Sequence, residues 1–267
     1  MDRFLALLPR LARCRLARCR LAEACLAGIV LLAGLAVGCR SQAPPAPGAA
    51  DRDALWHQYR AAIADARTAE PDEVASLTPI VPGPSDLRWR TRVRAPGDTV
   101  QQVRVVTWRD DTPLPGAAAS VAAGDTLTLR GVVWVTAVPE LRGFCQASGR
   151  TGDALDLRLR QRLGVPPDFR ATRFVELWVP PLALVRPCPD PSVTDRSCSR
   201  VAPRPRSIVA IDSTYRAWFD DLRATSYAPD GYPWTRLGYT YDWNPQTDEV
   251  GPSEFIVWPG AHVGVEA

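Results

Sequence analysis

Residues suited to ligand chemistry gather in the segment "GYPWTRLGYTYDWNP", residues 231–245. If residues 233–243 form a strand, side-chain alternation places Trp234, Arg236 and Asp242 on one face and mainly aromatic residues on the other. An indole that stacks on a ring, with a charged pair that fixes its orientation, is a candidate face for a sugar or a peptide. The alternative is structural: the aromatic face packs into the core, and the other is a sheet edge with satisfied polar groups.

A second polar face follows from the segment "LRWRTRVRA", residues 87–95. Apolar or small residues alternate with Arg88, Arg90, Arg92 and Arg94, which is the period of a half-buried strand. The four arginines are a candidate site for an acidic sugar, a lipid phosphate or a teichoic-type polymer. A solvated face that pairs with acids of a neighbouring strand explains the same pattern.

The cysteines predict one disulfide. Cys145, Cys188 and Cys198 follow residue 39, and the last two bracket a proline- and aspartate-rich loop that has no hydrophobic period. Proximity favours a bridge between Cys188 and Cys198 and leaves Cys145 as a free thiol, although three pairings are open. No Cys-x-x-Cys or histidine spacing supports zinc, so we expect no metal.

Signatures of catalysis are not found in the sequence. It contains no lysine, which excludes a Schiff-base lysine and a phosphate-loop lysine. No triad or nucleophile elbow occurs, and the neighbouring acids Asp220 and Asp221 point to different faces of a helix. We therefore expect no cofactor and lean against an enzyme, while a hydrolase that uses two carboxylates stays as the alternative.

The amino-terminal segment is typical of an export signal. Residues 24–38 are uncharged and follow six arginines. As a helix they span about 22 Å, which is shorter than the ~30 Å hydrocarbon core of a bilayer. Small residues lead into Cys39 in "LAVGC", and this boundary resembles the bacterial lipoprotein signal. The resemblance implies that residues 1–38 are removed as a signal peptide and that fatty acids are joined to Cys39.

The segments on both sides of Cys39 fit this interpretation. The repeated unit "RLARC" makes the leader long and suggests that translation begins nearer Leu16 or Leu21. Residues 39–51 are rich in proline and alanine and predict a flexible tether between lipid and domain. Because Arg40 rather than aspartate follows the cysteine, the resemblance implies the outer membrane, with the protein facing the periplasm.

The charge of the mature chain argues against nucleic acid. The formal net charge is +3, but the leader holds six arginines against two acids, so the rest of the chain is close to neutral. Phosphate-backbone binding needs a one-sided basic excess, and we expect no nucleic-acid partner. The expected partners are the membrane, through the lipid, and an envelope protein or glycan.

The elements that position these residues predict one α+β domain over residues 52–267. Helices are expected over 51–70, 151–164 and from 212, and strands over 87–95, 99–108, 127–138, 172–179, 233–243 and 253–260. This order predicts an antiparallel sheet of about five to six strands, covered by about two to three helices. The expected function is a lipid-anchored binding or assembly module of the cell envelope; the alternative is an envelope hydrolase acting on glycan or peptide.

Overall fold

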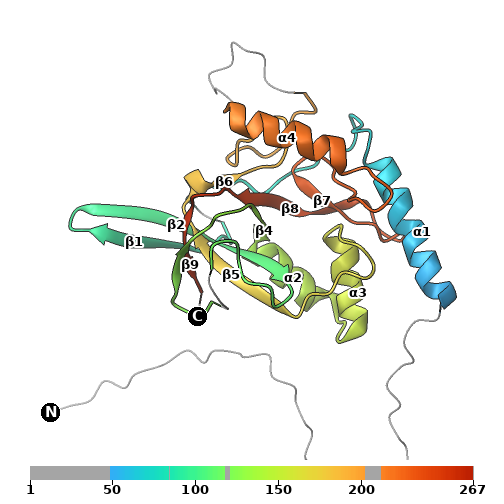
Figure 1. Cartoon of the computed structure of the whole chain (residues 1–267), viewed down its shortest axis with the longest axis horizontal. Helices are drawn as coiled ribbons and strands as arrows, with labels where there is room; N and C mark the ends of the chain where they lie inside the picture. Colours follow the sequence, from blue (N-terminus) through green and yellow to red (C-terminus); the bar gives the residue numbers. More distant parts are fainter. Residues whose placement is uncertain (1–48, 84, 118–120, 202–211, 267) are drawn as a thin grey trace, which may run out of the picture. The chain divides into compact units, whose positions relative to one another are not determined.

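An antiparallel sheet forms the centre of the structure, a computed structural model that describes residues 49–83, 85–117, 121–201 and 212–266 (Figure 1). Its strands are β1 (Trp89–Ala95), β2 (Asp98–Arg109), β3 (Thr126–Thr128), β4 (Val133–Ala137), β5 (Arg173–Val179), β6 (Leu184–Val185), β7 (Tyr239–Tyr241), β8 (Val250–Val257) and β9 (His262–Val265). The main path runs β3-β9-β5-β2-β4-β8-β6, while β1 pairs with β2 and β7 with β8. The predicted α+β class is confirmed, but the nine strands of the described residues exceed the expected number.

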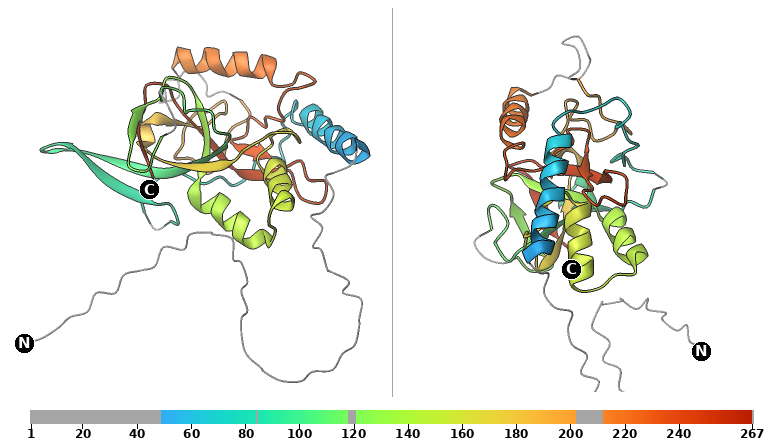
Figure 2. Two further views of the ribbon diagram at one scale, coloured as in Figure 1. Left: turned by 60° about the horizontal axis from the view of Figure 1, so that its bottom comes forward. Right: turned by 90° about the vertical axis from the view of Figure 1, so that its right-hand side faces the viewer.

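Four helices pack around this sheet in the described part of the chain. They are α1 (Ala49–Asp65), α2 (Val138–Ser148), α3 (Asp153–Arg162) and α4 (Ser213–Thr225), and a short 3-10 turn spans Pro181–Ala183. Helix α2 contacts β2, β4 and β8, and α3 contacts β7. Figures 1 and 2 show α4 on one side of β8 and the pair α2 and α3 on the other.

The two faces of the central strands have different neighbours. Val135 and Phe255 belong to the main apolar core, which loop residues and the curved sheet enclose. Since strand side chains alternate, the adjacent residues Thr136 and Glu254 point to the opposite face. Val106 of β2 pairs with Thr136, and Thr136 pairs with Glu254, so these three residues form one row across β2, β4 and β8.

The predicted hairpin of residues 87–108 is confirmed. Strands β1 and β2 pair antiparallel across a turn at Pro96–Gly97. Of residues 87–95, only Leu87 and Trp89 reach the core, and beyond them the hairpin projects from the body, with Val93 66% exposed (Figure 1). The predicted core face is therefore wrong for the outer half of the hairpin, because no layer of the described structure covers it.

The predicted strand of residues 127–138 is in fact two strands and the start of a helix. Strand β3 pairs with β9, whereas β4 pairs with β2 and β8. The break lies at Arg130 and Gly131: the Arg130 N–H donates to the Pro115 carbonyl at 3.0 Å, and a Cβ at Gly131 would lie 3.1 Å from the Pro115 Cβ. Pro139 lies in the first turn of α2, a position that proline favours.

The other three helices lie where the sequence predicts them. Helix α1 buries Tyr59 and Ile63 on the expected stripe. Helix α4 is capped by Asp212, whose Oδ1 accepts hydrogen bonds from the backbone N–H groups of Thr214 (2.6 Å) and Tyr215 (3.4 Å). Since local signals specify these helices, they were predictable without knowledge of the sheet.

Several predictions concern the amino terminus and lie outside the described residues. These are the signal peptide 1–38, the acylated Cys39 and the tether as far as residue 48. The last tether residues, 49–51, belong to α1 instead. In the part of the chain that is described, no helix has both the length and the apolar character needed to cross a bilayer.

The predicted disulfide between Cys188 and Cys198 is present, and Cys145 is a half-buried free thiol. The bridged loop is attached to the body by Arg186, a fully buried side chain. Its guanidinium donates hydrogen bonds of 3.0–3.2 Å to the backbone carbonyls of Thr78, Ser192 and Asp195. Burial lowers the pKa of Arg186 to about 10, so the group stays charged at neutral pH.

Candidate ligand-binding pocket

A pocket of about 450 Å³ opens over the row of Val106, Thr136 and Glu254. Strands β2 and β4, the turn after α3, the end of α4 and the turn that precedes β7 form its walls. Cavities of ~300–1,000 Å³ with mainly apolar walls are the usual sites of small ligands. The pocket is therefore the strongest candidate for a functional site in the described structure.

Aromatic rings make up much of the wall. They belong to Trp108, Trp134, Phe169, Tyr232, Trp234 and Tyr241. Trp134 and Tyr232 are 39% and 50% exposed and therefore mark the mouth. Thr136, Trp234 and Glu254 are only 5–6% exposed and form the floor.

Three polar atoms of the floor have no hydrogen-bond partner among the residues that the structure describes. They are Oγ1 of Thr136, Nε1 of Trp234 and Oε1 of Glu254. Leaving a buried polar atom unpaired costs ~1–3 kcal/mol, and folded proteins pair nearly all such atoms. The Trp234 indole also lies near enough to Glu254 to act on its carboxyl as a hydrogen-bond donor. The convergence of these polar atoms in one pocket makes the floor a candidate site for a polar group of a ligand.

Glu254 is the only carboxylic acid among the described residues that line the pocket. Burial raises its pKa well above the usual range, and the nearby Trp234 indole and Arg186 guanidinium act in the opposite direction with smaller effect. Glu254 forms no ion pair with any described residue, and a buried unpaired carboxylate is costly. We conclude that burial favours the neutral acid, which has an O–H to donate.

A glycine turn positions the floor. The Glu254 N–H donates to the carbonyl of Gly238 at 3.0 Å, which ties β8 to the turn that carries Trp234. Gly238 has a φ of +81°, and a Cβ there would lie 2.7 Å from Cδ of Arg186. The Trp234 ring packs edge-on against Phe219 of α4, with 5.0 Å between centroids. The turn therefore holds the indole between α4 and the pocket.

The three residues of the predicted ligand face do not share a strand face. Arg236 has a φ of +59°, and β7 begins only at Tyr239, so the expected strand over 233–243 is mostly a turn. Trp234 lines the pocket floor, whereas Arg236 donates a 2.7 Å hydrogen bond to the backbone carbonyl of Arg67, away from the pocket. The structure thus brings one of the three, Trp234, to the pocket.

Asp242 belongs to a buried ion pair. It is 2% exposed and accepts two hydrogen bonds from Arg158 of α3, at 2.9 and 2.7 Å. Arg162 adds a third contact at 3.3 Å. Asp242 therefore links the strand end to α3 and is not among the residues that line the pocket.

The four arginines of the second predicted polar face, which we call the arginine ladder, are Arg88, Arg90, Arg92 and Arg94. They lie on the projecting hairpin, outside the pocket. Arg90 turns inward: its Nε donates to Gln102 at 2.8 Å, and its guanidinium lies 4.7 Å from the centroid of the Trp178 ring. Arg94 pairs with Asp98 in solvent at 3.4 Å. The other two arginines form no ion pair with the described residues, so pairing with acids explains the ladder only in part.

Sequence reasoning did not assign Thr136 and Glu254 to a site. A signal exists, because each is a polar residue inside an otherwise apolar strand, in "VVWVTAV" and "EFIVW". Alternation alone does not reveal that the two residues are cross-strand neighbours, since that depends on the pairing of β4 with β8. The site is therefore recognisable only when this non-local pairing is known.

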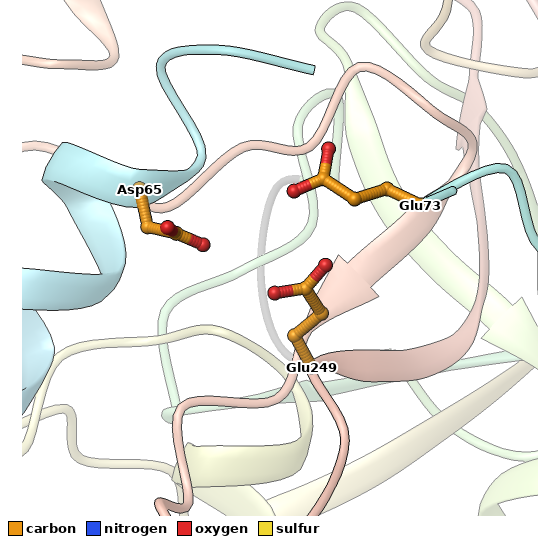
Figure 3. Close-up of side chains that lie close together, drawn as sticks. All are labelled: Asp65, Glu73 and Glu249. Atoms are coloured by element: carbon orange, nitrogen blue, oxygen red, sulfur yellow. The ribbon is translucent and has the colours of Figure 1, made fainter. Parts of the chain in front are cut away.

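A carboxylate cluster was also missed. Asp65, Glu73 and Glu249 turn their carboxylates toward one another, with one oxygen of each within 4.8 Å of the others (Figure 3). Burial, followed by the charges of Glu73 and Asp65, raises the pKa of Glu249 to about 7. This spacing is compatible with a hard divalent cation, but surface acids also gather without one, so the cluster alone does not define a metal site.

The sequence matches no family model, and no similar curated protein or solved structure was found. The function has to be argued from the geometry of the pocket and from the signals of the sequence.

Proposed function

We propose that the chain is a lipid-anchored protein of the bacterial cell envelope, at the outer membrane, whose body binds a small, mainly apolar ligand in the pocket.

The observation that carries this proposal is the pocket itself, with aromatic walls, a volume of about 450 Å³ and three unpaired polar atoms on its floor. A ligand that covers the aromatic rings removes apolar surface from water. The same ligand can form hydrogen bonds with the unpaired polar atoms of the floor.

The lining of the pocket favours binding over hydrolysis. Carboxylate hydrolases place two acids on either side of the bond that they cleave. Among the described residues that line the pocket, Glu254 has the single carboxylic acid, and it lies on the buried floor. The ion pair with Arg158 commits Asp242, the acid predicted nearby, to a structural contact.

The envelope location is supported by the leader and by the disulfide. The boundary at Cys39 resembles that of bacterial lipoproteins, and the bridge between Cys188 and Cys198 is of the kind that persists in oxidising compartments. The exposed arginines of the hairpin, among them Arg94, remain a candidate contact for an acidic polymer of the envelope.

Fluorescence of N-phenyl-1-naphthylamine, an uncharged apolar dye, tests the proposal. The full chain carrying Cys39→Ser, which removes the predicted acylation site, is titrated with the dye. We expect saturable binding, and we expect Trp134→Ala to weaken it about fivefold, because a ring at the mouth is worth ~1 kcal/mol.

Trp56→Ala is the matched control, since it removes the same side chain from α1, outside the pocket. We expect it to leave the dissociation constant of the dye unchanged. A folded protein that shows no saturable binding would contradict the proposal, as would an equal effect of the two variants.

A further inference from the structure

We propose that the pocket selects an uncharged amphiphile, whose alcohol, amide or ester group enters first and pairs with the floor, while its hydrocarbon or aromatic body lies against the rings. This inference rests on the proposed function and adds the chemical class of the ligand. It follows from the kinds of polar atoms on the floor and from the charges that are near them.

The unpaired atoms offer both donors and acceptors. The Trp234 Nε1–H can only donate and lies near enough to Glu254 to act on its carboxyl, the Thr136 hydroxyl can donate or accept, and a protonated Glu254 carboxyl has one O–H and one carbonyl oxygen. Thr136 and Glu254 are cross-strand neighbours, so one small group can reach both. An alcohol or an amide can accept from one of these atoms and donate to another.

A charged group is poorly matched to this floor. A cation would have to ionise Glu254, which lies among apolar neighbours, and an anion would be buried beside an acid with no cation in direct contact. Among the described residues that line the pocket, Arg109 is the cation. One of its nitrogens donates to the Pro113 carbonyl at 3.1 Å, while its buried Nε has no hydrogen-bond partner among the described residues, so an anion could be paired only at this wall and not on the floor. Arg109 belongs to the end of β2 and not to the row of Thr136 and Glu254.

The mouth and the wall match the rest of such a ligand. Trp134 and Tyr232 are partly exposed, so an apolar body that leaves the floor passes between exposed rings. Val106 and Leu141 extend the apolar surface on the side of β2 and α2. From the floor toward the mouth, the lining thus changes from polar to apolar. An amphiphile that enters with its head group first presents its groups in the same order.

Displacement of the dye tests this selection. Decan-1-ol, decanoate and decylammonium share one hydrocarbon chain and differ in the charge of the head group. With the full chain carrying Cys39→Ser, we expect decan-1-ol to displace the dye at about tenfold lower concentration than either ion, since an unfavourable buried contact costs ~1–3 kcal/mol.

Two variants remove one polar atom each from the floor and keep most of the side-chain volume. Thr136→Val removes the hydroxyl, and Trp234→Phe removes the indole N–H. We expect each variant to raise about fivefold the concentration of decan-1-ol that displaces half of the dye. This concentration is corrected for any change in the dissociation constant of the dye in the same variant. Trp56→Phe is the matched control and is expected to change nothing.

The outcomes separate this inference from the proposed function. If the dye binds but an ion displaces it as well as decan-1-ol does, or if none of the three displaces it, the inference is overturned. Unchanged displacement by decan-1-ol in both floor variants overturns it as well. If the folded protein shows no saturable binding of the dye, the proposed function itself fails.

Discussion

Asp242 illustrates how burial changes the meaning of a charged residue. In the sequence it is a candidate ligand contact beside several aromatic residues. In the structure its carboxylate is held by two nitrogens of Arg158 at 2.9 and 2.7 Å, and the Arg158 side chain is itself only 8% exposed. Removing one partner of such a pair leaves a buried charge without compensation.

We therefore expect Asp242→Asn to lower the free energy of unfolding by ~3 kcal/mol. Asp98→Asn is the control, because Asp98 pairs with Arg94 in solvent and exposed pairs are worth less than ~1 kcal/mol. Urea denaturation measures both. Equal losses of stability in the two variants would show that the buried pair has no special role.

Glu249 adds a pH dependence to the stability of the fold. Its pKa is raised from 4.5 to about 7 by burial and by the charges of Glu73 and Asp65, so between these values the folded state binds more protons than the unfolded state. The free energy of unfolding should then fall as pH rises from about 4.5 to about 7. Because solvent screens this half-buried group, we expect the fall to be ~1 kcal/mol.

Glu249→Gln should remove this part of the pH dependence, as measured by urea denaturation across the same range. The remaining fall in the variant belongs to the other buried acids, among them Glu254, whose pKa is also raised by burial. Asp86→Asn, a change at an exposed residue outside the cluster, is expected to keep the wild-type profile. A wild-type profile in Glu249→Gln contradicts the expectation.

At the scale of elements, the predictable parts carry their own local signals. Helix α4 has a capping Asp212, and α1 has a regular apolar stripe that ends before Pro71. Strands β6 and β9 have two and four residues, too few for a period, and they become strands only through pairing with β8 and β5. Helix α2 was missed because the alternating pattern of residues 127–138 predicts one strand up to Pro139, which in the structure lies in the first turn of the helix.

The turn before β7 depends on Gly238 for two reasons that can be separated. Gly238 and Gly97 have the same φ of +81°, but a Cβ at Gly238 would lie 2.7 Å from Arg186, whereas at Gly97 nothing lies within 4 Å. We expect Gly97→Ala to cost ~1 kcal/mol from backbone strain alone and Gly238→Ala to cost at least ~2 kcal/mol. Thermal denaturation compares them, and similar melting temperatures would mean that Arg186 gives way without cost.

At the scale of the whole molecule, the pocket is built from segments that the sequence keeps apart. The row of Val106, Thr136 and Glu254 requires that β4 lie between β2 and β8. The ring of Trp234 requires a turn at Arg236 with positive φ, where a strand was predicted. The class of the fold was predictable from periodicity, whereas the pocket was not, because pairing between distant strands creates it.

The predicted anchor is tested on the whole protein in its membrane. We expect the mature chain to begin at Cys39 and to carry fatty acids, which intact-mass analysis of the membrane fraction detects. Cys39→Ser should remove the fatty acids from the intact mass, because the thiol is the predicted acylation site. Cys145→Ser, which removes the free thiol of the body, should keep them, and a mature chain in the membrane fraction with an unmodified Cys39 would contradict the anchor.

The projecting hairpin has a consequence for how copies of the protein meet. Strand β1 pairs only with β2 in the described sheet, so its other border presents free amide and carbonyl groups to solvent. Such a border is a template for fibril-like stacking of one molecule on the next. If the β1 edges of two copies pair antiparallel, Arg92 and Arg94 of one copy come close to the same residues of the other. Repulsion between these like charges opposes the pairing. We therefore expect the arginine ladder to oppose self-assembly along this edge.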